Sequence, residues 1–191
     1  MTWKNTPAGF GTPVIVLHWL TLLLIVAAYA TMEFKSLTPR GSPGRALLAA
    51  WHYGLGLSVF ALVWLRLANR AVGATPAIVP PPAVWEARLA ALVHVALYAL
   101  MIALPLLGWL TVSARGDPVA LLGIALPALV GPDKAQARWF KNLHETLGTI
   151  GYVLIGLHAI AALFHHYVRC DNTLRLMWRK QWPASSVRFE R

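Results

Sequence analysis

Residues 143–168 read LHETLGTIGYVLIGLHAIAALFHHYV. This run is long and apolar enough to cross the hydrocarbon core of a membrane as a helix, which takes about 20 residues. His144 and His158 are 14 residues apart, nearly four helical turns, so both side chains point to one helix face. At about 1.5 Å per residue they lie about 21 Å apart along the axis. That separation suits two stacked cofactors, one near each membrane surface, and is too long for one shared metal ion.

Three further apolar runs precede this segment, so the chain reads as a single membrane domain, residues 1–191. We expect spans at about 13–34, 46–68, 89–112 and 143–168, followed by a short basic tail, 169–191. Only 13% of the residues are charged, against about 25% in soluble domains, which predicts a surface that faces lipid. The apolar stretch Val119 to Val130 is too short to span and contains Pro127, so we expect it at the membrane interface.

The first apolar run has an alternative interpretation as a cleaved signal peptide, because Ala28-Tyr29-Ala30 resembles a cleavage motif. The run continues past this motif, however, and contains His18. We therefore expect a retained transmembrane helix.

The net charge of +10 comes from basic residues between and after the apolar runs. This placement is typical of membrane-flanking charge and argues against nucleic-acid binding. Four spans put both termini on one side. That side, with the middle loop, holds ten Lys and Arg residues against seven on the other, which predicts cytoplasmic termini. The single cysteine, Cys170, excludes an internal disulfide.

The histidines are the residues that indicate a functional site within the membrane. Ionisable groups at membrane depth are costly and indicate function, although a lone histidine can also serve as a hydrogen-bond partner between helices. A transition-metal transporter would be expected to add carboxylates or thiols, but the acids lie at span ends or in loops. Five histidines lie well within the spans and two near the end of the fourth: His18, His52, His94, His144 and His158, then His165 and His166.

Depth within the membrane predicts how these histidines pair. His18 lies at the inner end of the first span, and His52 at the outer end of the second. The fourth span enters from outside, so His144 is outer and His158 deeper. The pairs His18–His158 and His52–His144 would each hold one haem iron through two axial ligands. Such haems suit electron transfer better than oxygen binding, and the absence of a Cys-x-x-Cys-His motif excludes covalent c-type haem.

Two neighbouring features leave alternatives open. Glycines follow His52 and separate the histidines of the fourth span, where they allow close approach either of a porphyrin or of another helix. Glu145 adjoins His144 and either orients its ring by a hydrogen bond or is a surface acid. The glycines are Gly54, Gly56, Gly148, Gly151 and Gly156.

Several segments resemble the prokaryotic cytochrome b561 family: HWL at 18–20, AYATMEF at 28–34, WH at 51–52, HETL at 144–147, GLH at 156–158, HHY at 165–167 and DNTL at 171–174. The resemblance covers about residues 14–180 and is closest to stand-alone dihaem members that oxidise superoxide. It implies an all-α, four-helix membrane bundle with two b-type haems between the helices, in a bacterial inner membrane. By position the axial ligands fall on His18, His52, His144 and His158. The resemblance also implies electron exchange with ubiquinone and oxidation of superoxide to oxygen.

The outer side is unusually basic, with seven Lys and Arg residues against four acids. Because superoxide is an anion, we expect Arg45, Arg115 and Lys141 to raise its encounter rate. The alternative is that these residues are solvated or bind anionic lipid. The other basic residues of this side are Lys35, Arg40, Lys134 and Arg138.

Two histidines are left for a quinone site. His165 lies seven residues after His158, on the same helix face and closer to the inner surface. It is the first candidate to donate a hydrogen bond to a quinone carbonyl, and His94 is the second. Either residue could instead be an interfacial histidine whose ring reaches water.

Three functions are consistent with the sequence. The first is a superoxide:ubiquinone oxidoreductase. The second is a b-type cytochrome subunit that carries electrons between the quinone pool and a partner such as a dehydrogenase or hydrogenase. The third is a non-redox membrane transporter with structural histidines, which purified protein without haem would support.

Overall fold

The computed structural model describes residues 3–121 and 123–178. Four long helices form the body: α1 (Thr12–Leu37), α2 (Pro43–Val72), α3 (Val84–Arg115) and α4 (Lys134–Tyr167). Each is long and apolar enough to cross a membrane, so the expected helical membrane bundle is confirmed. A short helix, α5 (Thr173–Leu176), follows α4. The end of the expected basic tail, residues 179–191, lies outside the described residues.

The helices begin and end at ordinary capping residues. Prolines stand in the first turns of α1 and α2, where the missing N–H is not needed. The side chain of Ser42 accepts a hydrogen bond from the Arg45 amide, and that of Asp133 accepts from two amides of α4. Gly116, with φ of 78°, follows the last residue of α3. Because these caps lie beyond the apolar runs, each helix is longer than the apolar segment that predicts it.

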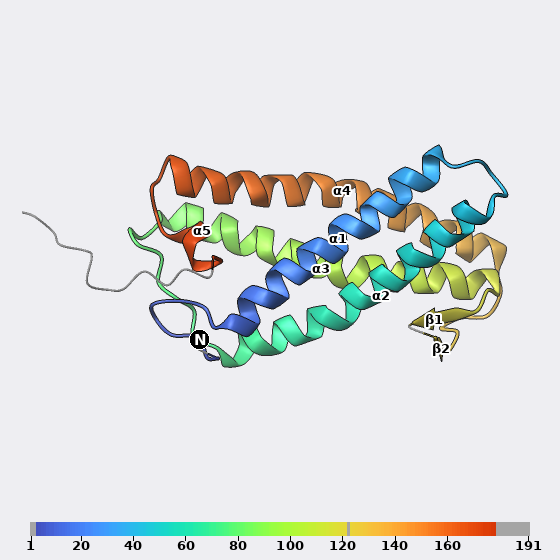
Figure 1. The fold of residues 1–191 in the computed structure, drawn as a ribbon, viewed down its shortest axis with the longest axis horizontal. Coiled ribbons are helices and arrows are strands. Elements are labelled where there is room, and N and C mark those ends of the chain that lie inside the picture. The colour runs from blue at the N-terminus through green and yellow to red at the C-terminus, as the bar shows by residue number, and fades with distance from the viewer. Residues whose placement is uncertain (1–2, 122, 179–191) are drawn as a thin grey trace, which may run out of the picture.

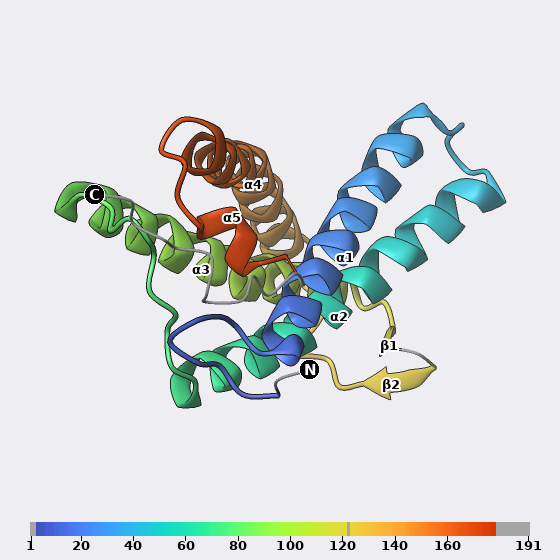
Figure 2. The ribbon, with the colours of Figure 1, turned by 60° about the vertical axis from the view of Figure 1, so that its left-hand side comes forward.

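The helices form two closely packed pairs, α1 with α2 and α3 with α4, and α2 also contacts α3. Figures 1 and 2 show the two pairs diverging from the region where α2 meets α3. No Cα atom of α1 lies within 8 Å of one in α4. Side chains bridge these helices instead: the Tyr29 hydroxyl donates to the Gly148 carbonyl, and the Tyr152 hydroxyl to Glu33, both at 2.8 Å.

The long helices bury little of their apolar surface against protein. In no helix is more than 17% of the most apolar 18-residue window buried. Leu23 of α1 and Val153 of α4, for example, are 64% and 61% exposed. Apolar surface of this extent is stable in a lipid bilayer, which is the environment that the four spans require.

The segment expected at the membrane interface folds as a hairpin, so the chain is not entirely helical. Strands β1 (Val119–Leu121) and β2 (Ile124–Leu126) pair antiparallel. The indole N–H of Trp109 donates to the Pro127 carbonyl at 3.1 Å, and Ser113 Oγ accepts from the Leu129 amide at 3.2 Å. Two side chains of α3 therefore hold the segment directly after β2 in place, a contact that apolar composition alone does not reveal.

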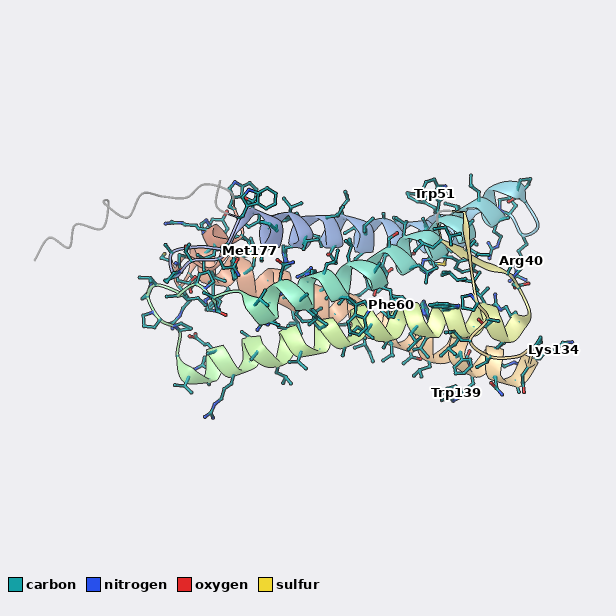
Figure 3. The ribbon with its side chains drawn as sticks, turned by 90° about the horizontal axis from the view of Figure 1, so that it is seen from below. Arg40, Trp51, Phe60, Lys134, Trp139 and Met177 are labelled. Atoms are coloured by element: carbon teal, nitrogen blue, oxygen red, sulfur yellow. The ribbon has the colours of Figure 1, made fainter. Side chains whose placement is uncertain are left out.

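The molecule has two distinct ends. The hairpin end comprises the α1–α2 loop, the β1–β2 hairpin and the start of α4, and the α5 end comprises the start of α1 and helix α5 (Figure 1). Arg40, Trp51, Lys134 and Trp139 lie toward the hairpin end, and Met177 lies toward the α5 end (Figure 3). Tryptophan and basic side chains at a span end are typical of a membrane interface.

Candidate functional site

At the hairpin end, His52 of α2 and His144 of α4 face one another, with ring centroids 6.0 Å apart. The Nδ1 of His52 donates to the Ala28 carbonyl at 3.0 Å, and that of His144 to the Leu104 carbonyl at 2.9 Å. A proton held on Nδ1 leaves the Nε2 lone pair free, which is the tautomer that binds a metal. We call these two residues the hairpin-end pair.

At the α5 end, His18 of α1 and His158 of α4 have ring centroids 6.3 Å apart. A third ring, His94 of α3, lies 5.4 Å from that of His158. The guanidinium of Arg66 approaches the pair from α2, with Nη2 3.3 Å from His18 Nδ1. We call His18 and His158 the α5-end pair. The structure thus brings together both pairs that depth matching predicts.

Both pairs fit haem iron by spacing and by donor chemistry. With metal–nitrogen bonds of about 2.0 Å, two imidazoles on opposite sides of one ion have centroids about 6 Å apart. The glycines near the pairs fit the same group. A Cβ added at Gly54 or Gly148 would meet no atom within 4 Å, and the same holds for Gly56 and Gly156. The open space beside these four glycines is compatible with a planar porphyrin and equally with lipid.

Gly151 has a different role from the other glycines of α4. A Cβ at this position would collide with the hydroxyl of Tyr29, which donates to the Gly148 carbonyl. The Tyr29 ring also lies against Tyr152, at 4.2 Å between centroids. Gly151 therefore allows α1 and α4 to meet through a tyrosine, which is the helix-packing interpretation of its small size.

Glu145 is a surface acid. It forms an ion pair with Lys141 at 2.7 Å, one helical turn away, and both side chains are about half exposed. The partner of His144 is instead the carbonyl of Leu104 in α3. Sequence adjacency therefore does not make Glu145 the group that orients the ring.

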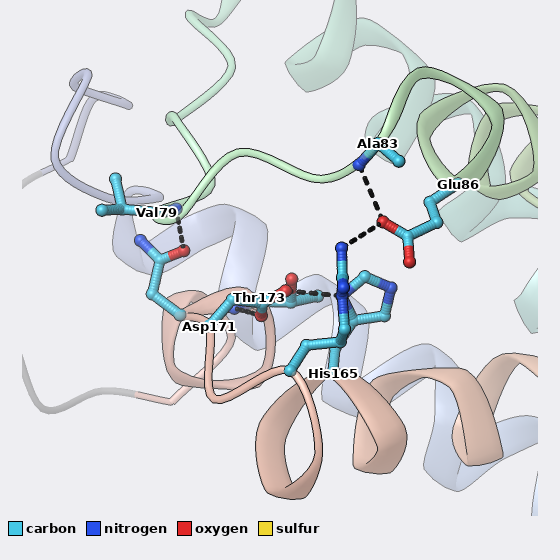
Figure 4. Close-up of polar contacts among 8 residues, drawn as sticks. Val79, Ala83, Glu86, His165, Asp171 and Thr173 are labelled. Carbon is cyan, nitrogen blue, oxygen red and sulfur yellow. Dashed lines mark hydrogen bonds and ion pairs between the residues drawn. The ribbon is translucent and has the colours of Figure 1, made fainter.

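His165 belongs to a polar cluster at the α5 end (Figure 4). Its Nδ1 lies 2.5 Å from Asp171 Oδ2, and the other oxygen, Oδ1, accepts from the Thr173 amide at 2.9 Å. Asp171 is only 3% exposed. Burial by itself would raise the pKa of Asp171, but the hydrogen bonds from His165 and Thr173 outweigh it and lower that pKa below its ordinary value.

Asp171 is a partner of His165 that the sequence did not predict. The signal that could have found it is the spacing: an acid six residues after a histidine, just past a helix end. The same loop is fixed by Asn172, whose side chain accepts from the Val79 amide at 2.8 Å and donates to the Ala77 carbonyl at 3.2 Å. Ion pairing between Arg169 and Glu86, at 2.9 Å, adds a further link to the start of α3.

The basic residues of the hairpin end have distinct local roles. Arg45 Nη1 donates to the carbonyls of Lys35 and Thr38, at 2.6 and 2.9 Å, and so stabilises the end of α1. Arg45, Arg115 and Lys141 all lie close enough to Lys35 to interact electrostatically with it. The three candidates for anion attraction therefore come from three helices and gather around one position.

Residues 9–180 match the family described as Prokaryotic cytochrome b561. The chain is 42% identical to "Cytochrome b561 homolog 1" of Escherichia coli (strain K12) over 173 residues, which covers 90% of this chain and 98% of that protein. It is 35% identical to "Probable superoxide oxidase CybB" of Yersinia pestis over 168 residues, 87% of this chain and 94% of that protein. A third relative, "Cytochrome b561 homolog 2" of Escherichia coli (strain K12), is 27% identical over 187 residues, 94% of this chain and 96% of that protein.

Proposed function

The chain belongs to the prokaryotic cytochrome b561 family, and from this membership we propose that it oxidises superoxide at one membrane face and reduces ubiquinone at the other. As a member, it is a membrane electron-transfer protein of a family that binds b-type haem. The observation that carries the finer proposal is the presence of two facing histidine pairs, one toward each end of the bundle. The relative named as a probable superoxide oxidase supports the choice of electron donor.

The two pairs are proposed as the axial ligands of two haems b. His52 and His144 would hold the haem of the hairpin end, and His18 and His158 that of the α5 end. Bound there, the haems would supply a one-electron relay across the bilayer. The contacts from Nδ1 to the carbonyls of Ala28 and Leu104 keep the hairpin-end rings in the metal-binding tautomer and fix their orientation.

The hairpin end is proposed as the face that meets superoxide, outside the bacterial inner membrane, and the α5 end as the cytoplasmic face with both termini. Positive charge from Arg45, Arg115 and Lys141 would attract the anion and raise its encounter rate. Arg45 is held by main-chain carbonyls, so its charge has a fixed place. Two superoxide anions yield two molecules of oxygen and two electrons.

The quinone is proposed to bind at the α5 end, where one ubiquinone takes up two electrons and two protons. His165 is the first candidate donor to a quinone carbonyl, because its ring is held by a buried carboxylate. The ionised carboxylate of Asp171 accepts from Nδ1 and fixes the orientation of the ring, which leaves Nε2 as the ring nitrogen that would face a quinone carbonyl. His94 remains the second candidate, but its ring lies close to that of His158.

The test is a stopped-flow experiment on the purified, oxidised protein. Superoxide should reduce the haems rapidly, and added ubiquinone should reoxidise them. His144→Leu should lose the hairpin-end haem and the rapid reduction by superoxide, whereas His166→Leu should behave as wild type. Haems that are present but inert to superoxide would reject superoxide as the donor and favour a cytochrome subunit fed by a partner dehydrogenase or hydrogenase. Protein purified without haem would instead favour the transporter.

A further inference from the structure

Arg66 is a charged residue among the histidines of the α5 end. It lies in α2, is half-buried, and its Nη2 is 3.3 Å from His18 Nδ1. Its guanidinium carbon lies 5.6 Å from the centroid of the Tyr98 ring in α3. The side chain therefore enters the space between the helix pairs instead of extending along the surface.

The charge of Arg66 has no carboxylate partner in residues 3–121 and 123–178. Ion pairs within 4.0 Å in this part of the chain join other residues: Lys141 with Glu145, His165 with Asp171, and Arg169 with Glu86. A guanidinium stays protonated in proteins, and an arginine at membrane depth is costly unless it meets an acceptor or an anion. A negatively charged group beside Arg66 would therefore lower the free-energy cost of its charge.

His18 cannot be that group when its Nε2 binds a metal. In such a ring the proton lies on Nδ1, as the contacts of His52 and His144 with carbonyls illustrate. A guanidinium has only donors, so two donors would then face each other at the position where Arg66 meets His18. Arg66 must turn to another acceptor once His18 is a ligand.

We propose that Arg66 binds a propionate carboxylate of the α5-end haem. This inference rests on the haem ligands proposed above. Haem b carries two propionates, and an arginine pairs with a carboxylate through charge-assisted hydrogen bonds. The pairing offsets the charge of the guanidinium inside the bundle. The positive charge of Arg66 would also raise the reduction potential of this haem above the value it would have without Arg66, which favours electron flow toward the α5 end.

The test compares Arg66→Gln and Arg66→Lys with Arg70→Gln, which removes an exposed charge one turn later in α2. Haem content and both reduction potentials are measured in a spectroelectrochemical titration of the purified protein. The component missing from His158→Ala identifies the α5-end haem. In Arg66→Gln we expect the equilibrium constant for electron transfer to that haem to fall about tenfold, which is about 59 mV for one electron. Arg66→Lys and Arg70→Gln should stay within about threefold of wild type.

A second readout concerns the propionate itself. The propionate carboxylate band in the reduced-minus-oxidised infrared difference spectrum should shift in Arg66→Gln and not in Arg70→Gln. Two bound haems with an unshifted band and unchanged potentials in Arg66→Gln would overturn the role of Arg66 alone. If Arg66→Gln does not retain the α5-end haem, Arg66→Lys decides: retention supports a charge contact, and loss there too rejects it. Wild-type protein with a single haem would overturn the proposed ligand set as well.

Discussion

At the hairpin end, two histidine side chains donate hydrogen bonds to main-chain carbonyls of neighbouring helices. His52 of α2 donates to Ala28 of α1, and His144 of α4 to Leu104 of α3. Each contact sets which ring nitrogen carries the proton and which way the ring faces. At the α5 end, His18 has a guanidinium at the corresponding position. The two pairs therefore have similar spacing but different electrostatic surroundings, and two haems held in them would be expected to differ in reduction potential.

The carboxyl group of Asp171 is ionised near neutral pH. Its pKa in the folded protein is lowered, below the ordinary value of about 3.9. The ionised carboxylate therefore stabilises the fold above that value, and the stabilisation is lost as the pH falls through the lower, folded-state pKa. Between about pH 5 and pH 8 Asp171 stays ionised. The negative charge of Asp171 should accordingly be constant over this range.

Replacing Asp171 with asparagine tests whether the pair of His165 and Asp171 serves quinone reduction. Asp171→Asn removes the negative charge at the acceptor of His165 Nδ1, so we expect quinone reduction to slow by about tenfold, a loss of about 1.4 kcal/mol of transition-state stabilisation. His165→Leu should slow it at least as much, while haem spectra stay unchanged in both. His166→Leu is the matched control. Normal quinone kinetics in His165→Leu would remove the pair from the quinone site.

At the scale of elements, α1 and α4 meet through side chains where their backbones stay apart. The rings of Tyr29 and Tyr152 pack against each other at a tilt between the two helices, and their hydroxyls donate to Gly148 and Glu33, respectively. This bridge lies close in sequence to the Ala28 carbonyl that holds His52. The distance between the helix pairs, on which the facing histidines depend, is therefore set in part by two tyrosines and one glycine.

Gly151→Ala should weaken this bridge. Its added Cβ would collide with the Tyr29 hydroxyl and break a hydrogen bond worth about 0.5–1.5 kcal/mol. Tyr29→Phe should cost about the same, and the double variant should cost less than the sum of the two, because both changes remove one contact. Thermal unfolding in detergent, followed by circular dichroism, measures the effect. Gly131→Ala, at an open loop position, is the control, and strictly additive losses would contradict the bridge.

At the scale of the whole molecule, charge and topology distinguish the two ends. Lys35, Arg45, Arg115 and Lys141 gather at the hairpin end, whereas the polar cluster of His165 and Asp171 lies at the α5 end. An anionic electron donor would react at the basic hairpin end, and a quinone that takes up protons would bind at the α5 end. The proposed direction of electron flow follows from this asymmetry.

The charge of the hairpin end should control the encounter with superoxide. We expect Arg115→Gln combined with Lys141→Gln to lower the second-order rate of haem reduction by superoxide about three- to tenfold at low ionic strength, and to flatten its salt dependence. The rate is measured by stopped flow across a salt series. Arg70→Gln, at the opposite end of α2, should leave it unchanged. Equal rates and equal salt slopes would reject electrostatic attraction.

The proposed orientation predicts which end of the molecule faces the cytoplasm. Cys170 is the single cysteine of the chain and is exposed just after α4. A membrane-impermeant maleimide should therefore label it in inverted vesicles and not in right-side-out ones. Gly131→Cys in a Cys170→Ala background should show the opposite pattern, since residue 131 lies in the loop before α4. Reversed labelling of both would place the termini outside.

Properties that belong to a single segment were predictable from the sequence. Span length, apolar composition and the 14-residue spacing of His144 and His158 depend only on residues close together in the chain, and the helical membrane fold that they predict is confirmed. The family resemblance is confirmed as well. The ligand roles of the histidines stay a prediction, although the structure brings the predicted pairs to 6.0 and 6.3 Å.

The hydrogen bonds and charge contacts around the histidines became visible only in the three-dimensional structure. His144 donates to the Leu104 carbonyl, whereas Glu145 pairs with Lys141. Asp171 contacts His165. The guanidinium of Arg66 contacts His18 of the α5-end pair. The stretch after α3 forms a hairpin, and Trp109 holds the segment directly after it. The physical reason is common to all of these: a hydrogen bond or a charge contact depends on distances between helices, and local composition and periodicity do not encode those distances.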